Sequence, residues 1–177
     1  MSRWAGLVLT LALLMAPTAC SGEKKVSAQT WAKDICGTVR PWAQSIQTSV
    51  ASTKNSTAAK SDPVAAKAQL ERVFGDAAKA TDKAIEGVDK AGRPDVKNGG
   101  KIAKELRAAL VAARSAFLKA QKAVGNVVTS DKAAFDARIG QIGAQLGKDY
   151  QAAGKKISVT QSAELKKVFD KTPECTA

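Results

Sequence analysis

The spacing of apolar residues is the feature that most constrains how this chain can fold. Between Trp31 and Val50, apolar residues recur every three or four positions, which places them on one face of an α-helix. Similar stripes run from Leu70 to Val88, from Ile102 to Val124 and from Phe135 to Tyr150, and no segment shows strand-like alternation of useful length. We therefore predict an all-α fold, an antiparallel bundle of about four amphipathic helices plus a short C-terminal helix.

Helix-breaking residues predict how the first helix ends and the second begins. Pro41 interrupts the first stripe, and since proline removes a hydrogen bond we expect a kink or break there. Residues 51–61 are rich in Ser, Thr, Ala and Lys and are interpreted as a loop. Asp62-Pro63 is typical of a helix start, and Gly92 of a helix end.

Similar signals bound the remaining helices. The third helix is expected between about Asp95 and Val124, with a regular start delayed to Lys101 by two glycines. Ser130 is the expected cap of the fourth helix. A shorter fifth helix is expected to end before Pro173.

The N-terminus has the three-part layout of a signal peptide. Arg3 precedes an apolar run from Leu7 to Ala16, and small residues follow. The run is shorter than the roughly 20 residues that a membrane-spanning helix needs. We predict a signal peptide over residues 1–19, a tether over 20–29 and a helical-bundle domain over 30–177.

The residues around Cys20 resemble the lipobox of bacterial lipoproteins, in which a cysteine is acylated and becomes the new N-terminus. Ala19-Cys20-Ser21-Gly22 fits this pattern, whereas Pro17 replaces the usual leucine. We predict a lipid anchor such as palmitate on Cys20, which would hold the domain on the extracytoplasmic face of the cell membrane. The alternative is ordinary cleavage after Val26-Ser27-Ala28 and release of a secreted protein.

Several short features together resemble small secreted lipoproteins of actinobacteria. They are the lipobox-like start, the cluster of Trp31, Cys36 and Trp42, the helices rich in Ala and Lys, and the terminal Pro173-Glu174-Cys175. The resemblance implies an exported helical domain and implies no functional residues.

The chain is basic, with a formal net charge of +12. A negatively charged partner is therefore favoured, such as anionic lipids, anionic envelope polymers or an acidic protein. Nucleic acid is not expected, because Trp31, Trp42 and Tyr150 fall on the apolar stripes and do not alternate with the lysines. On the third helix, five lysines lie within about 40° of one line, and the favoured interpretation is the solvated back of a bundle helix. The alternative is a contact surface for an anionic partner. Its residues are Lys97, Lys101, Lys104, Lys119 and Lys122.

The chain has no histidine, and this absence removes the common histidine-dependent catalytic and metal sites. We expect no catalytic residues, no metal site and no cofactor. An enzyme that uses carboxylates or lysine is kept as a remote alternative, which would need a cleft with several ionisable groups.

If Cys20 is acylated, Cys36 and Cys175 are the remaining thiols. Outside the membrane an oxidising setting favours a bond between them, which would tie the two ends of the domain together. The alternatives are two free buried thiols or an intermolecular bridge.

Gly140, Gly143 and Gly147 lie beside the apolar stripe of the fourth helix, although glycine weakens a helix. Close helix packing is the favoured explanation. The alternative is a groove for an apolar ligand, lined also by the stripe residues Phe135, Ile139, Ile142 and Leu146.

These observations favour a non-enzymatic, membrane-tethered interaction or structural protein of the cell envelope. The main alternative is a helical binding module that carries a lipid or another apolar ligand.

Overall fold

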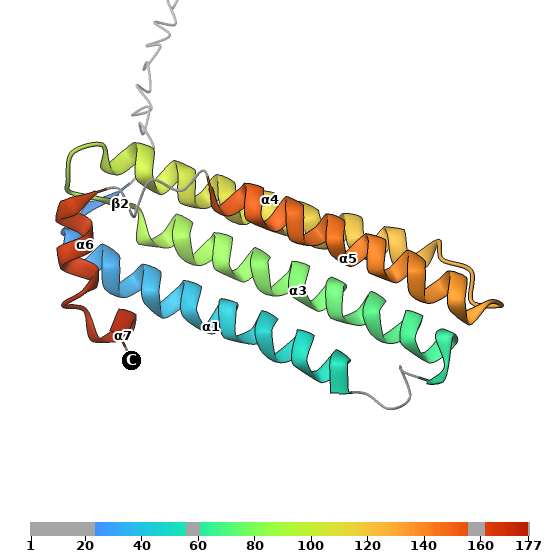
Figure 1. Ribbon diagram of the computed structural model, residues 1–177. Helices are drawn as coiled ribbons and strands as arrows, with labels where there is room; N and C mark the ends of the chain where they lie inside the picture. Colours follow the sequence, from blue (N-terminus) through green and yellow to red (C-terminus); the bar gives the residue numbers. More distant parts are fainter. Residues whose placement is uncertain (1–23, 56–60, 156–161, 177) are drawn as a thin grey trace, which may run out of the picture.

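The computed structural model describes residues 24–55, 61–155 and 162–176. In these ranges the chain forms six helices and two very short strands, which confirms the all-α prediction. The long helices are α1 (Ala28–Asn55), α3 (Pro63–Ala91), α4 (Gly99–Gly125) and α5 (Lys132–Gly154). The short helices α6 (Ala163–Phe169) and α7 (Pro173–Thr176) lie at one end of the bundle (Figure 1).

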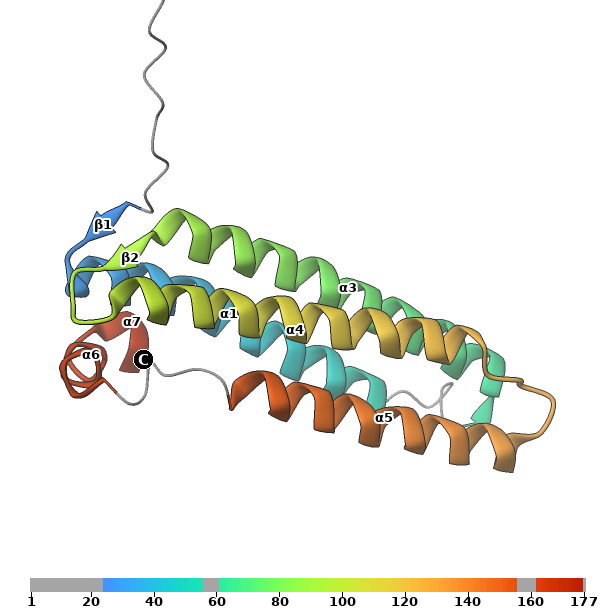
Figure 2. The same ribbon diagram turned by 90° about the horizontal axis from the view of Figure 1, so that it is seen from above.

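The helices do not form a symmetric square. α3 packs against both α1 and α4, whereas α5 packs mainly against α4 and has few contacts with α1 or α3. Figure 2 shows α5 on the side of α4 that faces away from α3. The bundle is therefore well packed through α1, α3 and α4, whereas α5 is not a close neighbour of α1.

The apolar stripes meet in two core clusters along the bundle. One surrounds Trp31 and includes Ile35, Leu106 and Leu165, near α6. The other contains Phe74, Phe117, Phe135 and Ile142, nearer the opposite end. Trp42 packs against both clusters. This arrangement explains the helical spacing in the sequence, because each stripe supplies the buried face of one helix.

The strands β1 (Lys25–Val26) and β2 (Arg93–Pro94) pair in parallel beside the start of α1. The Arg93 amide donates to the Lys24 carbonyl (2.9 Å), and the Asp95 amide donates to the Val26 carbonyl (2.7 Å). Gly92 makes this contact possible with a φ of 71°, since a Cβ there would lie 2.2 Å from the Lys24 oxygen. Residues 25–29, which we assigned to the tether, are thus held against the bundle.

Pro41 does not break α1, which continues from Ala28 to Asn55. Pro41 and Gly37, whose carbonyl would accept the missing hydrogen bond, both lie on the exposed side of the helix. Water can therefore replace that bond. The predicted break is wrong, and so is the loop prediction for residues 51–55.

The other helix boundaries were predicted with mixed success. Asp62 caps α3 through its side chain, and α3 ends before Gly92, as expected. The cap of α5 is Asp131 rather than Ser130, because the Asp131 carboxylate accepts from the Ala134 amide at 3.1 Å. Helix α4 starts at Gly99 rather than Asp95 or Lys101, after Asn98 with a φ of 62°. Helix α6 ends at Phe169, and Pro173 begins α7.

Candidate functional site

The disulfide predicted between Cys36 and Cys175 is present, with the two Cα atoms 5.1 Å apart. It joins α7 to α1, and two further interactions support the same contact. The Arg40 guanidinium donates to the Glu174 carbonyl (2.8 Å), and Lys33 Nζ lies 3.6 Å from the Glu174 carboxylate. The bond therefore holds the C-terminal segment against the first helix, as expected for a structural role.

Cys20, the predicted anchor, lies outside the described residues. The described chain begins at Lys24, four positions later, at the end of the bundle that carries β1, α6 and α7 (Figure 2). Among the helices of the described ranges, none is long and apolar enough to span a bilayer.

All five lysines of the candidate anionic-partner surface are exposed, but they do not form one surface. Lys97, Lys101 and Lys104 lie near β2, whereas Lys119 and Lys122 lie toward the other end of α4. At 1.5 Å per residue, Lys104 and Lys119 are about 22 Å apart along the helix. The structure thus divides the predicted stripe into two clusters.

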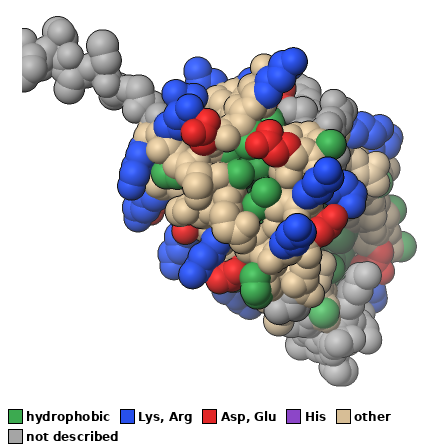
Figure 3. Space-filling model, turned by 90° about the vertical axis from the view of Figure 1, so that its left-hand side faces the viewer, with side chains coloured by type: hydrophobic (Ala, Val, Ile, Leu, Met, Phe, Trp, Pro, Cys, Tyr) green, Lys and Arg blue, Asp and Glu red, His purple; other side chains and the backbone are tan. Residues whose placement is uncertain are grey.

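The lysine cluster nearer to β2 lies at the end of the bundle that carries β1, α6 and α7. Figure 3 shows this end, where Lys and Arg side chains are interspersed with acidic ones. Lys25 pairs with Asp95 (2.7 Å) and Lys101 with Glu105 (3.7 Å). Within the described ranges, Lys97 and Lys104 form no ion pair. These two ammonium groups are therefore available to an anionic partner.

The glycines of α5 do not serve close helix packing, so the favoured prediction for them is wrong. No heavy atom of the described neighbouring residues lies within 4 Å of a Cβ built on Gly140, Gly143, Gly147 or Gly154. The reason is that α5 contacts α4 through a different face, on which Phe135 and Ile142 are buried.

Gly143 and Gly147 instead line an apolar groove between α1 and α5, with a volume of about 560 Å³. Its floor includes Phe117 of α4. No lining side chain is charged, and the hydrogen-bonding ones are those of Gln47 and Tyr150. We call this hollow the α1/α5 groove; its residues are Ala43, Ile46, Gln47, Val50, Ala51, Phe117, Gly143, Leu146, Gly147 and Tyr150.

A smaller apolar chamber of about 110 Å³ is separate from the groove but shares one lining residue with it, Tyr150. The chamber lies among Val39, Trp42, Leu106 and Ala153, and neighbouring residues of α4. The Tyr150 ring stacks on Trp42 (ring centroids 6.3 Å apart) and lies against Phe117 (6.2 Å). Burial raises the pKa of the Tyr150 hydroxyl, because ionisation is disfavoured away from water. The side chain of Tyr150 therefore reaches from α5 to α1 and forms part of the wall of both the groove and the chamber.

The predicted groove residues divide between this site and the core. Leu146 lines the α1/α5 groove as expected. Phe135 and Ile142 are buried in the core instead, and Ile139 packs against that core. The prediction missed the groove residues of α1, Phe117 of α4 and Tyr150 of α5. The sequence does not show which helices face one another across a groove.

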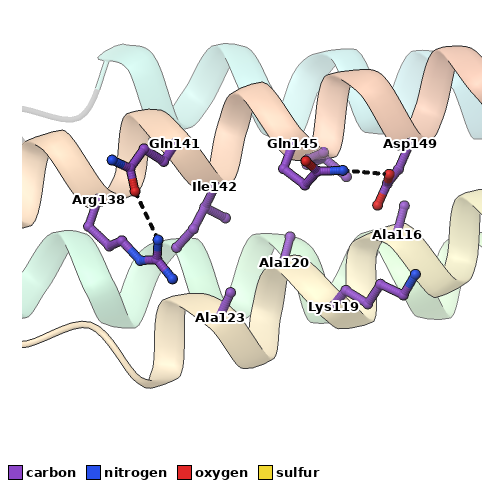
Figure 4. A pocket seen from close by; sticks show the side chains of 10 residues that line it. Ala116, Lys119, Ala120, Ala123, Arg138, Gln141, Ile142, Gln145 and Asp149 are labelled. Atoms are coloured by element: carbon purple, nitrogen blue, oxygen red, sulfur yellow. Dashed lines mark hydrogen bonds between the residues drawn. The ribbon is translucent and has the colours of Figure 1, made fainter.

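A second hollow, of about 360 Å³, lies between α4 and the other side of α5 and contains Lys119 (Figure 4). Alanines of α4 form its floor. The polar side chains on α5 bond within their own helix, from Arg138 to Gln141 and from Gln145 to Asp149, both at 2.8 Å. These bonds occupy part of the polar rim of this hollow.

Two of the carboxylates within the described ranges form ion pairs between α3 and α4. No group of three or more residues with metal-binding side chains comes together there. Arg107 pairs with Asp89 at 2.8 Å and Arg114 pairs with Asp82, so these carboxylates link α3 to α4. Comparisons of the chain with protein-family models, with curated proteins and with solved structures find no match.

Proposed function

We propose that this protein is a lipid-anchored interaction domain on the extracytoplasmic face of the cell membrane and that it performs no catalysis. The observation that carries the proposal is the position of β1. Cys20 precedes Lys24 by four residues, so an anchor there keeps the domain within about 13 Å of the bilayer at full extension.

The positive charge at the β1 end of the bundle supports an arrangement in which that end lies nearest the membrane. Lys97 and Lys104 are exposed there and lack carboxylate partners among the described residues. Lysines close to an anionic leaflet each contribute about 1 kcal/mol of attraction. Anionic lipids are therefore the first partner of this end, and anionic envelope polymers or an acidic protein are the alternatives.

Metabolic labelling with palmitate tests the anchor. The full chain should incorporate label and remain with the membrane fraction, whereas the Cys20→Ser variant should incorporate none. Cys36 and Cys175 provide an internal control, because they are joined in the disulfide and should carry no label. Recovery of unlabelled, unsubstituted chain in the culture medium would support the freely secreted alternative instead.

A second candidate function, binding of an apolar ligand, is favoured by the α1/α5 groove. Its volume lies in the range of about 300–1,000 Å³ typical of small-molecule sites. The two functions are compatible, because the groove lies along the side of the bundle and the tether lies at its end.

A further inference from the structure

We infer that the α1/α5 groove binds one acyl chain of an anionic phospholipid taken from the bilayer to which the domain is tethered. This inference rests on the proposed function for the source of the lipid. The binding site itself is the α1/α5 groove, and its geometry does not depend on the anchor.

The chemistry of the lining favours a hydrocarbon chain. The groove walls carry no charge, and the adjoining chamber is lined by Val39, Leu106 and other apolar groups. An extended peptide would bury backbone amides and carbonyls for which the walls offer only the side chains of Gln47 and Tyr150 as partners. A hydrocarbon chain has no such groups to satisfy.

The dimensions of the apolar surface also suit an elongated ligand. The groove and the chamber together run along α1 from Val39 to Ala51, which is about 18 Å of helix. Tyr150 lines both parts. A chain bound along this line would contact the helix backbone at Gly143 and Gly147, where no side chain intervenes.

Charge complementarity and the tether identify the rest of the ligand. Since no charged group lines the groove, the headgroup must lie outside it, on the surface of a chain whose net charge is +12. A basic surface favours an anionic headgroup. An anchor at Cys20 would keep the β1 end of the bundle within about 13 Å of a bilayer, where phospholipids are the most concentrated source of acyl chains.

The glycines allow a test in which the variants still fold. Leucine at Gly143 or Gly147 would fill the groove, and a Cβ there meets no described neighbour within 4 Å. Leucine also favours helix more than glycine does. Gly140 is the matched control, since it lies on the same helix in open space but does not line the groove.

The experiment uses the full chain purified from its expressing cells, with vesicles of phosphatidylglycerol whose acyl chains are brominated. Bromine quenches tryptophan on contact, and Trp42 lines the chamber. The unsubstituted protein and Gly140→Leu should show the same quenching. Gly143→Leu and Gly147→Leu should need at least about tenfold more lipid, or should not be quenched.

Native mass spectrometry of the same preparations should show one phospholipid per chain, lost in Gly147→Leu and retained in Gly140→Leu. The inference is overturned if Gly147→Leu titrates like the unsubstituted protein, if Gly140→Leu loses as much binding, or if the bound mass is a peptide. Palmitate labelling separates the two proposals. If the protein carries no palmitate label but its tryptophan is quenched, the groove proposal stands and the anchor proposal fails. If the protein is labelled but its tryptophan is not quenched, the anchor proposal stands and the groove proposal fails.

Discussion

The indole N–H of Trp42 donates a hydrogen bond to Oγ1 of Thr81, at 2.9 Å, and thereby joins α1 to α3. Thr81 is completely buried, and its hydroxyl in turn donates to the Ala77 carbonyl at 2.7 Å. This polar pair lies beneath the aromatic contact between Trp42 and Tyr150. The indole of Trp42 is thus held by a part-buried hydrogen bond to Thr81 and by its stacking contact with the Tyr150 ring, which lines the groove.

The Thr81 hydroxyl should therefore be required for stability. Thr81→Val keeps the shape but removes the acceptor, and a buried donor left unsatisfied costs about 1–3 kcal/mol. Thr81→Ser keeps the acceptor and should lose only about 0.8 kcal/mol for the missing methyl group. Urea unfolding followed by fluorescence measures both free energies. A valine variant at least as stable as the serine variant would contradict this role.

Loss of the disulfide should destabilise the domain without changing its oligomeric state. The bond closes a sequence separation of 139 residues, and replacement of both Cys36 and Cys175 by serine should lower the free energy of unfolding by about 2–5 kcal/mol. Thermal unfolding with and without reductant measures the effect, and the double variant should not respond to reductant. A reductant-sensitive dimer on non-reducing electrophoresis would indicate the intermolecular bridge instead.

Two glycines should respond in opposite directions to alanine. Gly92→Ala places a Cβ against the Lys24 carbonyl at a positive φ, so it should cost more than about 1 kcal/mol. Gly140→Ala meets open space within a helix and should stabilise the fold by about 0.4–1 kcal/mol. The difference in denaturation midpoints checks both signs. Equal effects would show that the β1–β2 contact does not depend on Gly92.

Alkaline pH should destabilise the fold in part through Tyr150. Burial raises the pKa of this hydroxyl above its ordinary value of 10.0, so the unfolded chain releases the proton more readily. The contribution of Tyr150 is therefore complete below that ordinary value and is lost as pH rises through the pKa of the folded state. Unfolding measured between about pH 9 and 11 should show a shallower loss of stability in Tyr150→Phe than in the unsubstituted protein. Parallel pH profiles would refute this assignment.

The two lysine clusters should differ in their attraction to membranes. In a chain that begins at Ser21 and carries no anchor, Lys97→Gln with Lys104→Gln should weaken binding to phosphatidylglycerol vesicles by about tenfold or more at low salt. Lys119→Gln with Lys122→Gln removes the same charge from the distal end and should have a smaller effect. Vesicle sedimentation measures both, and equal losses would favour a purely non-specific attraction.

The amphipathic spacing was sufficient to predict the helical class, because an apolar stripe on each helix must be buried against another element. Asp62, Pro63 and Gly92 marked helix ends for local reasons of capping and backbone conformation. Cys36 and Cys175 could be paired because they were the two thiols expected to remain in the mature domain. These inferences needed only local chemistry or a small number of possible pairings.

Which helices are neighbours was decided by tertiary structure alone. Periodicity shows which face of α5 is apolar, but it does not show that α5 lies on α4 and leaves a groove beside α1. For the same reason, the glycines were expected to pack closely and instead border open space. The lysines of α4 share an angular position, yet their separation along the axis divides them between the two ends. The sequence thus determined which face of each helix is apolar. Long-range packing decided which helix each apolar face contacts, because contacts between helices depend on the combined fit of many side chains that are distant in the chain.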